Sequence, residues 1–287
     1  MSVRIITDST ADIRPALAEQ IPFVSLMIRF GDREYTDGVT MSRKEFYEEL
    51  AACTDLPTTS QPTPPSFEAK YQEAVDAGDQ VIVITISSKL SGTFQSANNA
   101  AMDYEDDVYV VDSENATIGA GILAERAKQL ADSGMSARDI VDVLNKEKKD
   151  IRLFAALDTL EYLKRGGRLS KAAAFAGSML NIKPLFTVAD GEIKVIGKAR
   201  GTKQANTMLN KEVEKTGVDF TRPVMAGYTG TTDELLQTYL AGSGSLFAEL
   251  PNGVDKACVS GTIGTHVGPG AYTVAFFKKK SKSLLRK

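Results

Sequence analysis

The stretch QVIVITISSKLSGTFQSANNA, residues 80–100, decides the fold class. Its first part, 80–87, consists mostly of β-branched apolar residues without alternation, which is typical of a strand buried on both faces. A hydroxyl-rich loop follows, and a helix is predicted over 93–103. A strand that passes through a short loop into a helix is the repeating unit of α/β proteins with a parallel sheet.

The same alternation continues through the first half of the chain and changes near residue 150. Further strands are predicted at 3–8 and 108–113, and helices at 66–77, 117–132 and 137–148. Beyond residue 150, a strand at 151–158 and a hairpin around Asp190-Gly191 indicate a mixed sheet. We therefore predict an α/β fold with two α/β domains, residues 1–150 with a mainly parallel sheet and residues 151–287 with a mixed sheet.

The secondary structure of four other segments is also predicted. STADIRPALAEQ (9–20) is predicted as a capped helix, and FVSLMIRF (23–30) as one strand. DLPTTSQPTPPSF (55–67) is predicted as a stiff loop, because proline disfavours helix before it and cannot donate to a sheet. KAAAFAGSML (171–180) is predicted as a helix of mostly small residues.

Composition excludes several classes of function. The net charge of −3 gives no general attraction for nucleic acid. Cys53 and Cys258 form no spaced motif, and no apolar run reaches membrane-spanning length or resembles a signal peptide. We therefore expect a cytoplasmic protein without nucleic-acid partners or membrane insertion. The basic end KKKSKSLLRK (278–287) is either a solvated tail or a weak contact for an acidic partner or an anionic membrane surface.

Short hydroxyl and amide side chains follow most of the predicted strands. Ligands of open α/β sheets bind outside the carboxyl ends of the strands, so these loops are candidates for one polar pocket. The alternative is that each loop merely caps a helix. The loops in question are Asp8-Ser9-Thr10, Thr58-Thr59-Ser60-Gln61, Ser87-Ser88, Ser91-Gly92-Thr93, Asp112-Ser113-Glu114-Asn115, Tyr228-Thr229-Gly230-Thr231-Thr232 and Gly264-Thr265-His266-Val267-Gly268.

The loop at 87–93 indicates a carboxylate rather than a nucleotide. Neither a P-loop nor a G-x-G-x-x-G motif is present after a predicted strand. A carboxylate needs only two hydroxyls and a few N–H groups at a helix start. Ser91, Thr93 and the N–H of Gly92 supply these groups.

His266 is the only histidine, in the glycine-rich segment GTHVGPGAY, which we expect to be a loop after a strand. It either binds a carboxylate or moves a proton, or is an ordinary structural histidine. A histidine-based metal site and a serine triad are both disfavoured, because partner histidines and a G-x-S-x-G motif are lacking.

Two arginines next to glycines are candidates for anion contacts. Arg168 follows Gly166-Gly167, and Arg200 precedes Gly201. The alternative for both is simple solvation. Around 171–180 the small residues either pack tightly or leave a slot for a slender apolar ligand, whose walls would be Phe175, Met179, Leu180, Ile182 and Leu185.

Six segments resemble the DegV family of bacterial fatty acid-binding proteins. They are IITDSTADI (5–13), TTSQPTPPSF (58–67), ISSKLSGTFQSA (86–97), DTLEYLKRGGRLSKAAAFAGSMLNIKPLF (158–186), GKARG (197–201) and GTHVGPGA (264–271). The resemblance implies a long-chain fatty acid buried between or beneath two α/β domains. It also implies a carrier without enzymatic activity or cofactor, which presents the acyl carboxylate to a separate fatty acid kinase.

The resemblance assigns roles to matching residues. Thr59 and Ser91 would hydrogen-bond the carboxylate and His266 would join them, while Arg168 and Arg200 would lie near the carboxylate or face the kinase. Ser60, Gly92 and Thr93 are the adjoining candidates of the two hydroxyl loops. The preferred acyl chain stays open.

Burial of the acyl tail can supply most of the binding free energy of such a ligand, so uncharged contacts to its carboxylate are sufficient. Each buried methylene contributes about 0.8 kcal/mol, so a sixteen-carbon chain offers on the order of 10 kcal/mol before association costs.

An alternative function is a phosphotransfer subunit that resembles dihydroxyacetone kinase, in which His266 holds a small polar ketone. A long apolar tunnel favours the first function, and a small polar cup favours the second.

Overall fold

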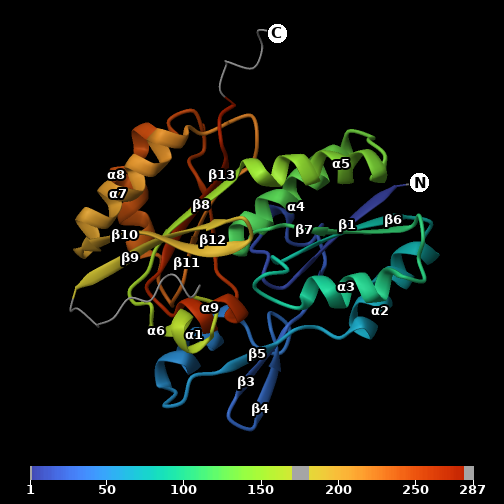
Figure 1. Cartoon of the computed structure of the whole chain (residues 1–287), viewed down its shortest axis with the longest axis horizontal. Coiled ribbons are helices and arrows are strands. Elements are labelled where there is room, and N and C mark those ends of the chain that lie inside the picture. The colour runs from blue at the N-terminus through green and yellow to red at the C-terminus, as the bar shows by residue number, and fades with distance from the viewer. Residues whose placement is uncertain (1, 170–180, 281–287) are drawn as a thin grey trace.

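The computed structural model describes residues 2–169 and 181–280 (Figure 1). Its first sheet has four strands in the order β2-β1-β6-β7, and all neighbouring strands are parallel. These strands are β1 (Val3–Asp8), β2 (Phe23–Val24), β6 (Gln80–Thr85) and β7 (Val108–Asp112). The predicted parallel sheet of the first half is confirmed.

Helices cover both faces of this sheet. Alternate residues of β6 face opposite ways: Val81 and Val83 join one core cluster with α2 (Pro64–Asp76) and α3 (Thr93–Ala101). Ile82 and Ile84 join another cluster with the helices on the other face, α4 (Thr117–Asp132) and α5 (Ala137–Glu147). Because both faces are covered, the strand needs apolar residues at every position.

The second sheet has six strands and is mixed, as predicted. Only β11 and β12 pair in parallel, and the other neighbours are antiparallel. In spatial order the strands are β10 (Glu192–Arg200), β9 (Ile182–Ala189), β8 (Ile151–Ala156), β13 (Tyr272–Phe277), β11 (Val224–Tyr228) and β12 (Asp255–Cys258). The β9–β10 turn has Asp190 at φ 54° and Gly191 at φ 77°, which confirms the predicted hairpin.

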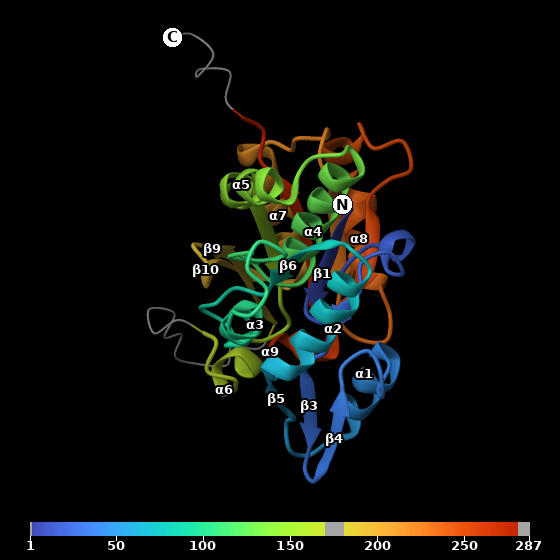
Figure 2. The same cartoon turned by 90° about the vertical axis from the view of Figure 1, so that its right-hand side faces the viewer.

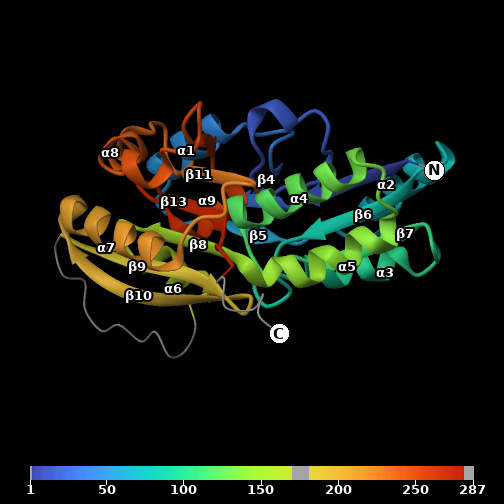
Figure 3. The same ribbon diagram turned by 90° about the horizontal axis from the view of Figure 1, so that it is seen from above.

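Helix α4 joins the two sheets (Figures 1 and 3). One face of the six-stranded sheet is covered by α7 (Gly201–Thr216) and α8 (Glu234–Gly242). The other face shares a core cluster with α4 and with the four-stranded sheet, so that Ile82, Ile122 and Leu153 belong to one cluster. All strands of the four-stranded sheet precede residue 150 and all strands of the six-stranded sheet follow it, yet the two sheets share this core.

A third, small sheet projects from the body of the molecule (Figure 2). The predicted single strand 23–30 is wrong, because it divides into β2 and β3 (Met27–Phe30), which belong to different sheets. Between them, the N–H of Leu26 donates to Oγ of Ser9 at 3.0 Å, which pins the chain where it changes sheets.

The rest of the small sheet corrects the predicted proline loop. Strand β3 pairs with β4 (Arg33–Thr36) and with β5 (Thr58–Ser60), which lies inside the loop predicted at 55–67. Beside the sheet lies α1 (Arg43–Ala52), and its start at the Ser42/Glu45 capping box was predictable.

The predicted helix 9–20 is also wrong. Only a 3-10 turn at Pro15–Leu17 forms there. The carboxylate of Asp12 turns inward, where it accepts hydrogen bonds from the Thr117 hydroxyl at 2.6 Å and from the N–H of Ser260 at 2.9 Å. These long-range contacts compete with an α-helix, and the segment forms turns instead.

Two short helices complete the site region, α6 (Glu161–Arg165) and α9 (Gly261–Val267). Two further 3-10 turns lie at Lys148–Asp150 and Gly244–Phe247. The predicted helix 171–180 lies outside the described residues. Within the described parts, no helix combines the length and apolar character needed to cross a membrane.

Candidate functional site

Strand β5 and helix α9 bring two predicted site residues together. Oγ1 of Thr59 lies 2.9 Å from Nε2 of His266. The sequence predicts His266 in a loop, but it lies on α9. Asp37 fixes the start of this helix, because its carboxylate accepts the N–H groups of Gly261 and Thr262 at 3.2 and 3.0 Å.

The loop between β6 and α3 holds the second group of predicted residues. Oγ of Ser91 lies 2.8 Å from Oγ1 of Thr93 and accepts the N–H of Thr93 at 3.3 Å. Gly92 stands against Gln61, whose side-chain oxygen any Cβ at position 92 would meet. Gln61 in turn donates to Oγ of Ser96 at 2.7 Å, so the proline loop is tied to the start of α3.

Four predicted polar residues line one largely apolar cavity. Thr59, Ser91, Arg168 and His266 are part of the wall of a cavity of about 70 Å³. The remaining wall is mostly aliphatic and comes from the six-stranded sheet, α4, α6, α9 and connecting segments: Leu26, Ile86, Leu90, Ala116, Thr117, Leu153, Leu163, Phe186, Val188, Ile193, Thr262, Ile263 and Val267. The cavity is therefore an apolar chamber with a few polar side chains on its wall.

A second cavity of about 30 Å³ adjoins the first. The two share five lining residues: Thr117, Leu153, Phe186, Ile263 and Val267. The second cavity continues between β8, β11 and β13 and is lined by Ala155, Gly227, Val259 and Ala271 among others. Together they trace an apolar path away from His266.

His266 is neutral at pH 7 in this arrangement. Burial, and to a smaller extent the nearby Arg168 guanidinium, lowers the pKa of its imidazole from 6.5 to about 4. Nδ1 has no hydrogen-bond partner among the described residues. It lies against Gly166, where any Cβ would collide with it, so glycine at 166 is what lets α6 approach the ring.

The two predicted arginines lie in different surroundings. Arg168 lines the cavity, and its guanidinium donates to the carbonyl oxygens of Leu90 at 3.3 Å and Gly166 at 2.6 Å. Arg200 is exposed at the start of α7, where its N–H donates to Oε1 of Gln204 at 2.5 Å. It does not line either cavity.

The other predicted ligand residues do not line the cavity. Ser60 is exposed, since its side chain points to the opposite side of β5 from Thr59. Gly92 and Thr93 adjoin Ser91 behind the wall.

Two of the predicted acyl-wall residues, Ile182 and Leu185, lie in the described part of the chain, and neither lines these cavities. Leu185 lies in the core cluster under α7, whereas its neighbour Phe186 lines the cavity. Side chains of a strand alternate between faces, and the sequence does not reveal which face of β9 is hollow. Ile182 lines neither cavity. Phe175, Met179 and Leu180 lie outside the described residues.

Sequence reasoning missed most of the chamber. Leu153, Val188, Ile193, Ile263 and Val267 come from four elements, β8, β9, β10 and α9, that meet only in the folded chain. Each is an ordinary apolar core residue in the sequence, and no local pattern marks it. In residues 2–169 and 181–280, no three His, Cys, Asp or Glu side chains are grouped as metal ligands would be.

Comparison with known proteins agrees with this architecture. Residues 2–279 match the family described as "Uncharacterised protein, DegV family". A DegV domain-containing protein of Caldanaerobacter subterraneus is 36% identical over 281 residues, which cover 97% of this chain and 99% of that protein. Protein DegV of Bacillus subtilis is 39% identical over 209 residues, 71% of this chain and 74% of that protein.

Solved structures extend the similarity to three dimensions. A DegV family protein from Thermus thermophilus, described by its fatty acid binding, superposes with a TM-score of 0.86 at 31% identity and covers 97% of this chain and 100% of its own. DegV of Bacillus subtilis, described as a fatty acid binding protein, gives 0.80 at 33% identity with the same coverage. A stearic acid-binding protein from Eubacterium ventriosum gives 0.84 at 26% identity and covers 96% and 98%. This chain belongs to the DegV family.

Proposed function

We propose that this protein binds a long-chain fatty acid and presents its carboxylate to an ATP-dependent fatty acid kinase. The observation that carries the proposal is the position of Thr59, Ser91 and His266 on the wall of an apolar chamber. Relatives with solved structures are described as fatty acid-binding proteins, which supports the same ligand class.

The head group of the ligand would meet uncharged donors. When Nε2–H of the neutral His266 imidazole donates to Oγ1 of Thr59, the hydroxyls of Thr59 and Ser91 can each donate a hydrogen bond to a carboxylate oxygen. Arg168, on the same wall, adds positive potential without being buried. Neutral donors satisfy the buried carboxylate and still leave an oxygen free to react.

The tail would lie along the apolar path and supply most of the affinity. One water molecule needs about 10–15 Å³ on the same volume scale. Cavities of about 70 and 30 Å³ therefore hold only part of a long acyl chain. The proposal therefore requires lining side chains to move outward when the acyl chain enters. Ile263 and Phe186 are bulky side chains that line both cavities, so they are among the first that must move.

The chemistry would belong to the kinase. A carboxylate oxygen attacks the γ-phosphorus of ATP, the bond to the ADP oxygen breaks, and acyl phosphate and ADP result, with Mg²⁺ held by the kinase. Arg200, exposed at the end of the β9–β10 hairpin, is proposed as a kinase contact. Because ATP is the donor, we place the protein in the cytoplasm, where the acyl phosphate would enter phospholipid metabolism.

A binding experiment tests the first half of the proposal. Protein stripped of lipid is titrated with palmitate, oleate and, as the small polar alternative, dihydroxyacetone. Saturable one-to-one binding of a fatty acid, with a shift of the His266 ring signals, supports the proposal. Binding of dihydroxyacetone without binding of either fatty acid would favour the phosphotransfer alternative.

A kinase experiment tests the second half. Loaded protein, ATP, Mg²⁺ and a bacterial fatty acid kinase are combined, and acyl phosphate is trapped with hydroxylamine. Hydroxamate that forms only in the presence of this protein supports presentation to the kinase. Tight fatty acid binding without any hydroxamate, with a kinase shown to be active on its own carrier, would contradict it.

A further inference from the structure

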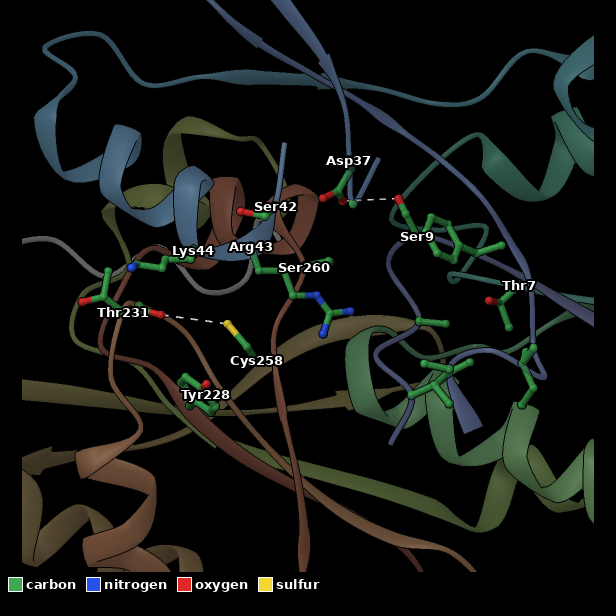
Figure 4. A pocket seen from close by; sticks show the side chains of 17 residues that line it. Thr7, Ser9, Asp37, Ser42, Arg43, Lys44, Tyr228, Thr231, Cys258 and Ser260 are labelled. Atoms are coloured by element: carbon green, nitrogen blue, oxygen red, sulfur yellow. Dashed lines mark hydrogen bonds between the residues drawn. The ribbon is translucent and has the colours of Figure 1, made fainter. Parts of the chain in front are cut away.

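A separate cavity of about 630 Å³ lies at the other end of α9 and has no lining residue in common with the 70 Å³ chamber (Figure 4). Its walls come from the carboxyl ends of three strands, β1, β11 and β12, and from the start of α1. This is the edge of an α/β sheet at which small ligands bind.

Two cationic side chains and several hydroxyls form the polar wall of this cavity. The Arg43 guanidinium extends into the enclosed space (Figure 4), and Lys44 lines the same wall. The Arg43 guanidinium has five N–H donors. Its only ion pair among the described residues joins Nη2 to Oδ1 of Asp12 at 3.0 Å. The other donors remain for a ligand. Lys44 is exposed, and its Nζ lies 3.8 Å from Oε1 of Glu48.

The one carboxylate on the wall is already occupied. Asp37 accepts the N–H groups of Gly261 and Thr262 and lies 3.3 Å from Oγ of Ser9. Its oxygens are therefore turned to the protein, and the groups that face the cavity are mainly donors. A donor-rich wall suits an oxyanion.

Two buried hydroxyls on the wall lack partners. Ser260 is 2% exposed and Thr7 is 0% exposed, both line the cavity, and neither Oγ of Ser260 nor Oγ1 of Thr7 has a hydrogen-bond partner among the described residues. Buried polar groups in folded proteins are nearly always paired, and an unpaired one is a sign of an absent ligand or water. This observation is independent of the charges.

One part of the wall is apolar and comes from the segment between β1 and the start of β2. It comprises Ala11, Ile13, Ala18, Ile21 and Phe23. Phe23, 37% exposed, is one of the few large exposed apolar side chains of the described residues. An apolar surface opposite cationic donors fits a ligand with two unlike ends.

We propose that this cavity binds a small organic oxyanion that carries an apolar group. Arg43, Lys44 and the Ser260 hydroxyl contact the oxyanion, and the Ile13, Ile21 and Phe23 side holds the apolar group. A carboxylate and a phosphate monoester share this chemistry. The site has no lining residue in common with the 70 Å³ chamber and shares only Tyr228 with the adjoining 30 Å³ cavity, so its contacts with the oxyanion do not depend on fatty acid binding.

The test is an NMR titration with three probes: phenyl phosphate, benzoate and inorganic phosphate. Saturable binding of phenyl phosphate or benzoate, with shifts at the amides of Arg43, Lys44 and Ser260, supports the site, and the tighter of the two identifies the head group. No saturation, shifts located elsewhere, or inorganic phosphate binding as tightly as phenyl phosphate would overturn it. The titration is run with and without bound oleate, so its outcome is separate from that of the acyl chamber.

Variants assign the binding to these residues. Lys44→Gln and Ser260→Ala should each weaken the tighter probe by about threefold to tenfold, since each removes one donor. Lys70→Gln is the matched control, because Lys70 is also an exposed helix lysine paired with a nearby glutamate. Arg43→Gln should abolish binding; it also removes the partner of buried Asp12, so Lys44→Gln and Ser260→Ala decide the question if it fails to fold. Affinity unchanged in both would overturn the proposal.

Discussion

Thr59 and His266 are separated by 207 positions in the sequence, yet Oγ1 of Thr59 lies 2.9 Å from Nε2 of the imidazole. The contact joins the small three-stranded sheet to α9, and it lies on the wall of the apolar chamber. The proposed function rests on this pair, because when Nε2–H donates to Oγ1 the Thr59 hydroxyl remains free to donate to a carboxylate at one point of an otherwise mostly apolar wall.

The empty protein should contain a neutral His266 down to low pH. Burial and the nearby Arg168 lower the pKa of His266 to about 4. Since it is the only histidine, its ring proton gives one unambiguous NMR signal. We expect a titration midpoint near 4 without ligand and a higher midpoint with bound fatty acid, because a nearby carboxylate favours the imidazolium. A midpoint near 6.5 in empty protein would show that the ring is not buried as described.

The same pKa shift should appear in the pH dependence of stability. Between pH 6.5 and 4 the unfolded chain binds a proton at His266 and the folded protein does not, so acidification through this window lowers the free energy of unfolding. The full effect is about 3 kcal/mol. Buried Asp8, Asp12 and Asp37 act in the opposite direction, because burial raises the pKa of each.

Comparison with His266→Gln isolates the histidine, since the carboxylates are common to both proteins. Chemical denaturation at a series of pH values should show the wild type losing about 3 kcal/mol more than the variant between pH 7 and 4. Parallel profiles would contradict the assigned shift.

Thr59→Val should weaken fatty acid binding about tenfold, because valine keeps the shape but removes a hydrogen bond to a charged group. Titration with palmitate measures the change. Thr58→Val is the control, since Thr58 is an exposed neighbour on β5 that does not line the cavity. Equal losses in the two variants would indicate a general effect on the strand and remove Thr59 from the head-group site.

Ile263→Phe should shorten the acyl chain that the protein accepts. Ile263 lines both apolar cavities, so added bulk there closes the path between them. We expect binding of palmitate to fall by about tenfold or more relative to octanoate. Ile196→Phe, at a 38% exposed position of β10, serves as the control. An unchanged palmitate-to-octanoate ratio would place the chain on another path.

Arg200→Ala should lower the rate of acyl phosphate formation with the kinase and leave palmitate affinity unchanged, because Arg200 is exposed and does not line either cavity. Arg165→Ala is matched to it, as an exposed arginine on α6 that pairs with Glu161. Loss of fatty acid from Arg200→Ala would instead assign Arg200 to the carboxylate.

Elements with strong local patterns were predictable. The parallel strands follow from apolar runs without alternation, and the hairpin from Asp190-Gly191. The helix predicted at 9–20 does not form, because Asp12 accepts hydrogen bonds from Thr117 and Ser260, which are distant in sequence. Strand β5 was hidden among prolines, and its partner β3 lies some thirty residues earlier.

The polar part of the candidate site could be found from sequence, and its apolar part could not. Hydroxyls and a lone histidine are conspicuous beside glycines, and Thr59, Ser91 and His266 do lie on one wall. The choice between Leu185 and Phe186 depends on which face of β9 borders empty space, and only packing decides that.

The most direct measurement is native mass spectrometry of the protein taken straight from cells, followed by extraction and analysis of any released lipid. We predict one fatty acid per chain, which Thr59→Val loses more readily than the wild type does. Protein that arrives empty, and stays at its apoprotein mass after incubation with palmitate and oleate, would contradict it.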